Sequence, residues 1–67
     1  MKRFNADTGS EEKLPNVDSF IEEVIELCKK YDLSIRHEDR YGAFEVYGKF
    51  DEDSASWLRS AYYIPSK

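Results

Sequence analysis

The sequence predicts a small α+β domain with the order helix, strand, strand, helix, built around an antiparallel β-hairpin and preceded by a flexible N-terminal arm. Three observations support this order. An apolar stripe of helical period begins at Pro15, the period shortens from about 3.6 residues to about 2 after Asp32, and helical spacing returns after an acidic run at Asp51. The 67 residues have room for one domain, which we assign to residues 15–67.

Residues 1–14 show neither the helical nor the strand period. Their large apolar side chains are Phe4 and Leu14, and three basic residues balance three acidic ones. A segment that cannot bury an apolar face does not offset the entropy of ordering, so we expect a flexible arm over residues 1–14. The alternative is an arm that becomes ordered when it contacts a partner.

From Pro15 onward, apolar residues recur at spacings of three and four, which predicts an amphipathic helix. Asn16 can cap the first free N–H groups, and Ser19 with Glu22 offers an alternative capping box one turn later. Cys28 is expected to act as a small apolar filler. The stripe consists of Val17, Phe20, Ile21, Val24, Leu27, Cys28 and Tyr31.

After Asp32, apolar and polar residues alternate, which predicts a strand with one buried face. Leu33, Ile35 and His37 would share the buried face, with Ser34, Arg36 and Glu38 on the other side. A second strand follows over residues 43–47, and Gly42 can take the positive φ of a tight turn. His37 is therefore expected to be a structural histidine, although Asp39 could reach it, and the acids at 38 and 39 are assigned to the bend of the hairpin.

Gly48 is expected to end the second strand, and a second helix is predicted from Ser54 to Ile64. Asp51 or Asp53 can cap this helix, where their charges also complement the positive end of its dipole. Pro65 would close it. Its apolar side is formed by Ala55, Leu58, Ala61 and Tyr62, widened by Trp57 and Ile64.

Aromatic residues crowd into residues 41–67, and a two-stranded sheet with two helices cannot enclose them all. Tyrosine and tryptophan are common at interface hot spots, so the exposed ones are candidates for partner binding. We expect Phe44 and Trp57 to fill the core, although Trp57 is also an interface candidate. The predicted partner-binding residues are Tyr41, Tyr47, Asp51, Glu52, Asp53, Trp57, Tyr62 and Tyr63.

The sequence offers little for catalysis, cofactors or membranes. It has no Gly-rich phosphate loop, nucleophile elbow or paired metal motif, so we expect no enzyme activity, no cofactor and no metal site. No apolar run approaches the roughly 20 residues of a membrane span, and the first residues do not form a signal peptide. We therefore expect a cytoplasmic protein without membrane contact.

The stretch from Leu27 carries "LCKKYDLSIRHEDRYGAFEV" and then "WLRSAY". This pattern resembles small uncharacterised proteins encoded by phages and prophages of Gram-positive bacteria, over about half of the chain. The motif is distinctive but carries no known chemistry. Short phage proteins of this size and layout include anti-defence factors, which bind and disable a bacterial immune protein, and a Hachiman anti-defence protein is one candidate match.

Two classes of function follow from these observations. The first is a phage-encoded interaction protein in the cytoplasm of the bacterial host, which binds and inhibits a host defence protein. The second is a nucleic-acid-associated regulator with a basic face formed by Lys29, Lys30, Arg36, Arg40 and Lys49. The net charge of −4 disfavours nucleic acid, whose phosphates usually require a basic surface.

A homodimer is expected in either case. A core of this size usually needs a disulfide, a metal or a second subunit, and Cys28 is the only cysteine. The unpaired edges of a two-stranded sheet and an aromatic-rich second helix are the two surfaces that could supply the contact.

Overall fold

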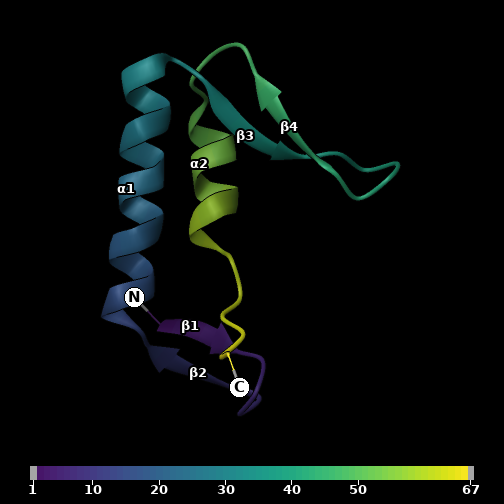
Figure 1. Cartoon of the computed structure of the whole chain (residues 1–67). Helices are drawn as coiled ribbons and strands as arrows, with labels where there is room; N and C mark the ends of the chain where they lie inside the picture. Colours follow the sequence, from purple (N-terminus) through teal and green to yellow (C-terminus); the bar gives the residue numbers. More distant parts are fainter. Residues whose placement is uncertain (1, 67) are drawn as a thin grey trace.

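The computed structural model describes residues 2–66, which fold as two β-hairpins and two helices in the order β-β-α-β-β-α (Figure 1). The α+β class is confirmed, and Met1 and Lys67 lie outside the described residues. Each hairpin is an antiparallel two-stranded sheet. The elements are β1 (Lys2–Asn5), β2 (Ser10–Lys13), α1 (Pro15–Tyr31), β3 (Ser34–His37), β4 (Phe44–Tyr47) and α2 (Glu52–Arg59).

The predicted flexible arm is wrong, because residues 2–13 form the β1–β2 hairpin. Phe4 pairs with Glu11, and Gly9 takes a φ of 71° in the connecting turn. Asn5 closes that turn: its side-chain Oδ1 accepts from the Asp7 N–H at 2.9 Å, and its carbonyl accepts from the Gly9 N–H at 2.9 Å. Polar contacts hold this hairpin in place, so it forms without an apolar alternation in its strands.

The other edge of β1 pairs with the C-terminal segment. The Tyr63 N–H donates to the Phe4 carbonyl at 2.8 Å, and the Ala6 N–H donates to the Tyr63 carbonyl at 2.8 Å. The rings of Phe4 and Tyr62 lie 4.9 Å apart between centroids. The two ends of the described chain therefore meet at one end of the molecule (Figure 1).

Arg3 connects the N-terminal hairpin to both helices. Its side chain is 2% exposed, and its Nη2 donates to Asp18 Oδ1 in the first turns of α1 at 2.8 Å. Its Nη1 donates to the carbonyls of Arg59 and Ala61 at 2.8 and 2.6 Å. One buried guanidinium thus joins β1, the start of α1 and the end of α2.

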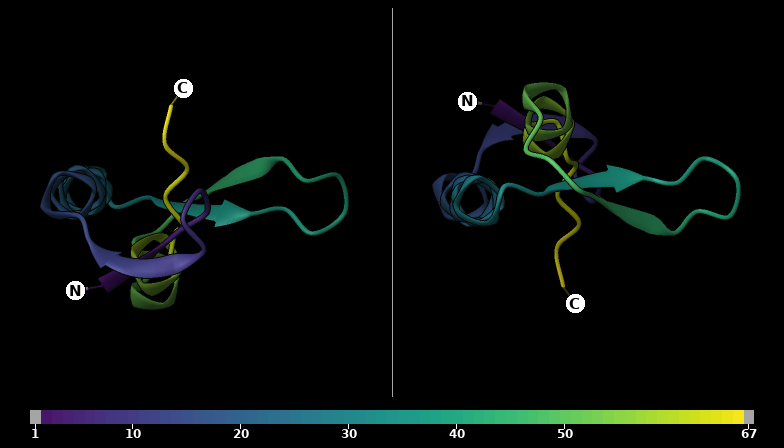
Figure 2. Two further views of the ribbon diagram at one scale, coloured as in Figure 1. Left: turned by 90° about the horizontal axis from the view of Figure 1, so that it is seen from below. Right: turned by 90° about the horizontal axis from the view of Figure 1, so that it is seen from above.

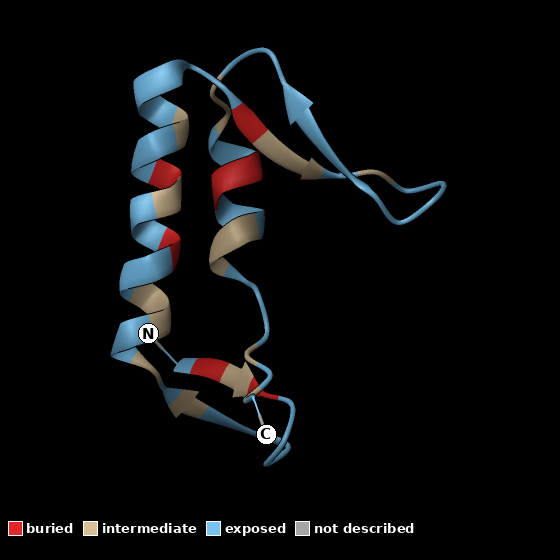
Figure 3. Ribbon diagram, in the orientation of Figure 1, coloured by how far each residue is buried: buried red, intermediate tan, exposed pale blue. Residues whose placement is uncertain are grey.

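The helix α1 has the predicted bounds, but only part of its apolar stripe is covered. It begins at Pro15 without a side-chain cap, so the predicted Asn16 cap is wrong. It ends at Tyr31, and the next residue, Asp32, takes a left-handed φ of 52°. Ile21 and Ile25 are buried against Ala55 of α2 (Figure 3). The stripe residues Phe20, Leu27 and Tyr31 remain more than half exposed.

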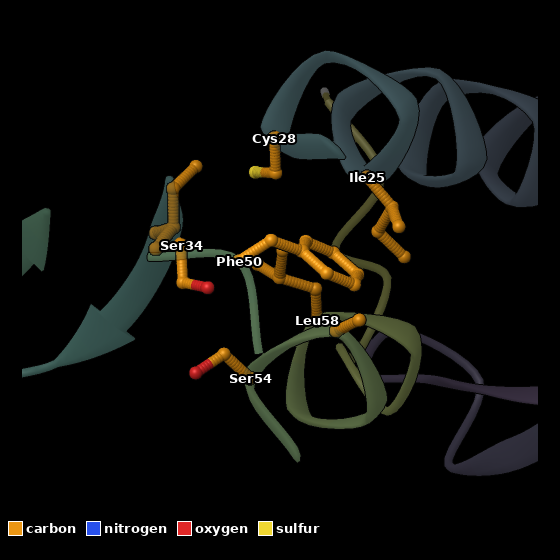
Figure 4. A pocket seen from close by; sticks show the side chains of 8 residues that line it. Ile25, Cys28, Ser34, Phe50, Ser54 and Leu58 are labelled. Atoms are coloured by element: carbon orange, nitrogen blue, oxygen red, sulfur yellow. The ribbon is translucent and has the colours of Figure 1, made fainter. Parts of the chain in front are cut away.

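The core between the helices and β3 is small and tightly closed. Val17, Phe50 and Leu58 pack partly buried around the three buried apolar residues. Cys28 and Ser34 line the remaining gap with Phe50 (Figure 4), and this gap leaves no room for a water molecule. The space is therefore a packing seam of the core, and Cys28 fills it as expected.

The helix α2 is shorter than predicted. Asp51 caps its start, as expected, and its Oδ1 accepts from the Asp53 N–H at 3.2 Å. The helix ends at Arg59, before Ala61, Tyr62 and Ile64. The Tyr63 N–H, which a longer helix would direct to the Arg59 carbonyl, donates instead to the Phe4 carbonyl of β1, and the Arg59 and Ala61 carbonyls accept from the Arg3 guanidinium. The apolar spacing beyond residue 59 thus belongs to an extended segment that reaches β1.

The β3–β4 hairpin was predicted correctly, with Gly42 at a φ of 74° and the second strand ending before Gly48. It projects away from the helices (Figure 2). The predicted buried face of the first strand is wrong, because Ser34 is 2% exposed whereas Leu33 and His37 are exposed. Ser34 is buried because its hydroxyl donates to the Lys49 carbonyl at 2.8 Å.

Phe44 was expected in the core and is 70% exposed. The register places it opposite His37, and it places Val46 opposite Ile35. Phe44 and Val46 point to the opposite side of β4 from Glu45 and Tyr47, and β4 contacts no element other than β3. This arrangement leaves Phe44 without a packing partner in the core.

We expect Arg3→Met to lower the free energy of unfolding by about 3 kcal/mol, because it leaves Asp18 and two carbonyls without their buried partner. Urea denaturation followed by circular dichroism measures the change. Lys2→Met is the matched control, since it removes the same charge from an exposed position of the same strand. Equal stabilities of the two variants would contradict the role of Arg3.

Candidate interaction site

An open groove of about 370 Å³ lies between the β3 end of the projecting hairpin and the N-terminal half of α2. The strand side supplies charged groups and an imidazole, and the helix side supplies carboxylates, a hydroxyl and an indole. The lining residues are Arg36, His37, Asp39, Asp51, Asp53, Ser54 and Trp57. We call this surface the hairpin–helix groove.

Arg36 fixes the hairpin to the helix at the inner end of the groove. Its Nη2 lies 3.3 Å from Asp51 Oδ2, and its Nε donates to the Ser54 hydroxyl at 3.3 Å. Its guanidinium carbon lies 3.6 Å from the centroid of the Tyr47 ring, a cation–π contact with the neighbouring strand. The positive charge of Arg36 is therefore occupied within the chain.

Asp51 is the acid that this network holds ionised. The Ser54 hydroxyl donates to Asp51 Oδ2 at 2.9 Å, and the Asp53 N–H and Arg36 donate as well. The Ser54 hydrogen bond, supported by these two donors, lowers the pKa of Asp51 below its usual value of 3.8. Asp51 is thus a structural acid that caps α2 and orients Arg36.

His37 lies between an acid and the indole. Its Nδ1 is 3.4 Å from Asp39 Oδ1, and its ring centroid is 6.2 Å from that of Trp57 at an interplanar angle of 49°. The His37 side chain is 52% exposed and that of Asp39 is 100% exposed. These residues form an open rim and do not form an enclosed catalytic pair.

Besides Asp51, the groove combines two carboxylates that no lysine or arginine of the described residues engages with an accessible aromatic ring. Within the described residues no ion pair engages Asp53, and Asp39 contacts only the His37 ring. Trp57 is 44% exposed beside them. An aromatic face flanked by carboxylates is suited to a guanidinium or ammonium group, through cation–π and charge-assisted contacts.

The structure separates the predicted partner-binding residues into four places. Asp51, Asp53 and Trp57 line the hairpin–helix groove, and Tyr47 lies next to them under Arg36. Glu52 faces Arg59, with 3.9 Å between Oε2 and Nη1. Tyr41 is 84% exposed near the tip of the hairpin. Tyr62 and Tyr63 lie at the opposite end of the molecule, where Tyr63 pairs with β1.

The bend of the hairpin is built by Glu38. Its carboxylate accepts from the Arg40 N–H at 2.7 Å and from the Tyr41 N–H at 2.5 Å. The assignment of both acids to the bend is confirmed, and Asp39 also lines the groove and contacts the His37 ring. This division of roles was not visible from the sequence, where the two acids are adjacent.

Sequence reasoning did not place Arg36, Asp39 and Ser54 in the site. The only available signal was the acidic N-terminus of α2, where Asp51 and Ser54 have the three-residue spacing of an ST-type side-chain contact. Arg36 was predicted on the solvent face of its strand. Its reach to α2 depends on how the hairpin crosses that helix.

The described residues contain no group of three or more potential metal ligands. No helix among them is both long enough and apolar enough to cross a membrane. Comparison with protein-family models, curated proteins and solved structures finds no match for the chain.

The pH dependence of stability tests the Asp51 network. Because the folded-state pKa of Asp51 is lowered, its contribution is fully present above its usual pKa of 3.8 and is lost as the pH falls through the folded value. We expect Asp51→Asn to be less stable than wild type at neutral pH. The difference should shrink at pH values below 3.8.

Urea denaturation across this pH range measures the effect. A difference between Asp51→Asn and wild type that is independent of pH would contradict the network.

Proposed function

We propose that the chain is a small phage-encoded interaction protein that binds and inhibits a bacterial protein of an anti-phage defence system in the host cytoplasm. It acts without catalysis and as a homodimer. The phage origin and the class of target rest on the sequence pattern from Leu27 to Ala61. The mode of binding rests on the hairpin–helix groove.

The observation that carries this proposal is that Trp57 lines one groove with the carboxylates of Asp39 and Asp53. Arg36 neutralises Asp51 internally, whereas no lysine or arginine of the described residues pairs with Asp39 or Asp53. A basic side chain of the target would stack on the indole and meet these carboxylates. Such partly enclosed aromatic positions are typical of hot spots in protein interfaces.

The acidic balance of the chain agrees with a basic target surface. Opposite charges on two proteins raise the rate of encounter and select against acidic partners. The Tyr47 ring, which is exposed and stacks against the Arg36 guanidinium, would extend the surface that contacts the target beyond the groove. The inhibitor would thus recognise a basic segment of the host protein and cover it.

A nucleic-acid-associated regulator has less support. Of the five cations that would form its basic face, Arg36 is bound to Asp51, and Lys29 lies 3.3 Å from Glu26 and over the Phe50 ring. The remaining three, Lys30, Arg40 and Lys49, would have to bind phosphates although the chain itself has a net charge of −4. Binding of this kind would weaken steeply as salt increases.

Affinity capture from defence-carrying bacterial cells tests the proposal. We expect the wild-type chain to retain a stoichiometric host protein, and we expect Asp53→Lys and Trp57→Ala each to reduce its affinity at least about tenfold, as removal of a hot-spot contact does. Mass spectrometry identifies the partner, and titration of the purified pair gives the affinities.

Glu23→Lys is the matched control, because it makes the same charge change at an exposed position of α1 away from the groove. It should bind like wild type. Equal affinity of the groove variants and wild type would exclude the groove as the site. Low-salt binding to nucleic acid in place of any protein partner would overturn the proposed class.

A further inference from the structure

The strand β4 has one edge that nothing in the described part of the chain covers. β3 contacts both helices, whereas β4 contacts no element other than β3. All four residues of β4 are exposed, including Phe44 at 70% and Val46 at 61%. The hairpin also stands clear of the helices (Figure 2), so a further strand could approach this edge.

The pairing pattern shows which backbone groups lie on that edge. The Glu38 N–H donates to the Ala43 carbonyl at 2.8 Å, which makes 38 and 43 a hydrogen-bonded pair of the ladder. Hydrogen-bonded and non-bonded pairs alternate in an antiparallel sheet, so Glu45 and Tyr47 also turn toward β3. Phe44 and Val46 therefore direct their N–H and C=O groups outward.

We propose that the homodimer forms by antiparallel pairing of β4 with β4 of a second copy, with Val46 on the two-fold axis. Each Val46 N–H would donate to the Val46 carbonyl of the other copy, which satisfies the outward groups of both edges. A two-fold contact uses the same surface on both subunits, as this pairing does. The inference rests on the homodimer of the proposed function and does not depend on the identity of the target.

Charge selects this register over its nearest alternative. Residues that lie directly opposite each other in two antiparallel strands have their side chains on the same face of the sheet, and side chains alternate along each strand. A two-fold axis perpendicular to the sheet can therefore pass through Glu45 or through Val46, but not between them. An axis at Glu45 would set two carboxylates directly opposite each other, which is unfavourable. An axis at Val46 instead sets Glu45 opposite Tyr47 of the other copy, whose ring carries the Arg36 guanidinium.

The same register places Phe44 opposite Gly48 of the other copy. A Cβ built on Gly48 would meet no heavy atom within 4 Å, so the space above this residue is open. An aromatic ring facing a strand-end glycine covers the backbone that the missing side chain leaves exposed. The Val46 register thus gives the exposed Phe44 ring a contact that it lacks in the monomer.

The dimer would have a four-stranded antiparallel sheet in place of two isolated hairpins. A two-stranded hairpin is marginal alone, and additional strands with an apolar face stabilise it. Because the axis is perpendicular to the sheet, both α2 helices would lie on one face. Both hairpin–helix grooves would then be presented to the target on the same side.

Size exclusion with light scattering tests the contact. The wild-type chain should have about twice its 7.9 kDa mass at micromolar concentration. Val46→Pro removes the outward N–H but none that points to β3, so it should keep the circular dichroism spectrum and raise the dimer dissociation constant at least about tenfold. Val46→Thr keeps the N–H and should remain dimeric.

Glu45→Gln distinguishes the two registers. It should leave a dimer centred on Val46 about as tight as wild type, since Glu45 then faces Tyr47 of the other copy and no second carboxylate. It would strengthen a dimer centred on Glu45 by removing the repulsion between the two carboxylates. A wild-type monomer, a dimer that persists in Val46→Pro, or a tighter Glu45→Gln dimer would each overturn the assignment.

Cross-linking gives an independent measurement on folded protein. In a Cys28→Ser background, cysteines at position 46 should be joined by a short bismaleimide, whereas cysteines at position 41 lie about 34 Å apart along the paired strands and should not be joined. Cross-linking at 41 but not at 46 would overturn the register. Cross-linking at 46 supports the edge contact even where capture finds no host protein, so the two proposals fail separately.

Discussion

The buried Arg3 guanidinium is the contact on which the rest of the structure depends. It joins the first strand to the Asp18 carboxylate of α1 and to the carbonyls that follow α2, so three segments distant in sequence meet at one side chain. Its Nε has no hydrogen-bond partner among the described residues, which is a cost of burying it. A buried ion of this kind is held by several simultaneous bonds, and loss of any one leaves the others poorly compensated.

Polar contacts carry much of the fold because the apolar core is so small. Ile21, Ile25 and Ala55 are its buried members, while Ser34 and Asn5 are buried through hydrogen bonds. Arg59 extends this pattern on the surface, where Glu22 accepts from it at 2.9 and 3.3 Å and holds the helices side by side. The apolar surface left uncovered on α1 and on the hairpin is correspondingly large.

The hairpin–helix groove is likewise held by a few polar side chains that each make several contacts. Arg36 is bound twice, by Asp51 and Ser54 on the helix and by the Tyr47 ring on the strand, so the hairpin keeps its angle to α2. Asp51 both caps the helix and anchors this arginine, and the remaining carboxylates stay available at the rim. Asp51 therefore stabilises the fold, whereas Asp39 and Asp53 are the acids proposed to bind a basic partner.

The sequence by itself determined the local elements: the bounds of α1, the β3–β4 hairpin with Gly42 in its turn, and the Asp51 cap of α2. These depend on period, turn chemistry and capping, which act over a few residues. Only the tertiary structure decided that residues 2–13 are a hairpin, that α2 stops at Arg59, and that Asp39 and Asp53 line one groove with Trp57. Each of these depends on a polar side chain that reaches a partner far along the chain, as Arg3 reaches Ala61 and Arg36 reaches Asp51, and such contacts leave no periodic pattern in the sequence.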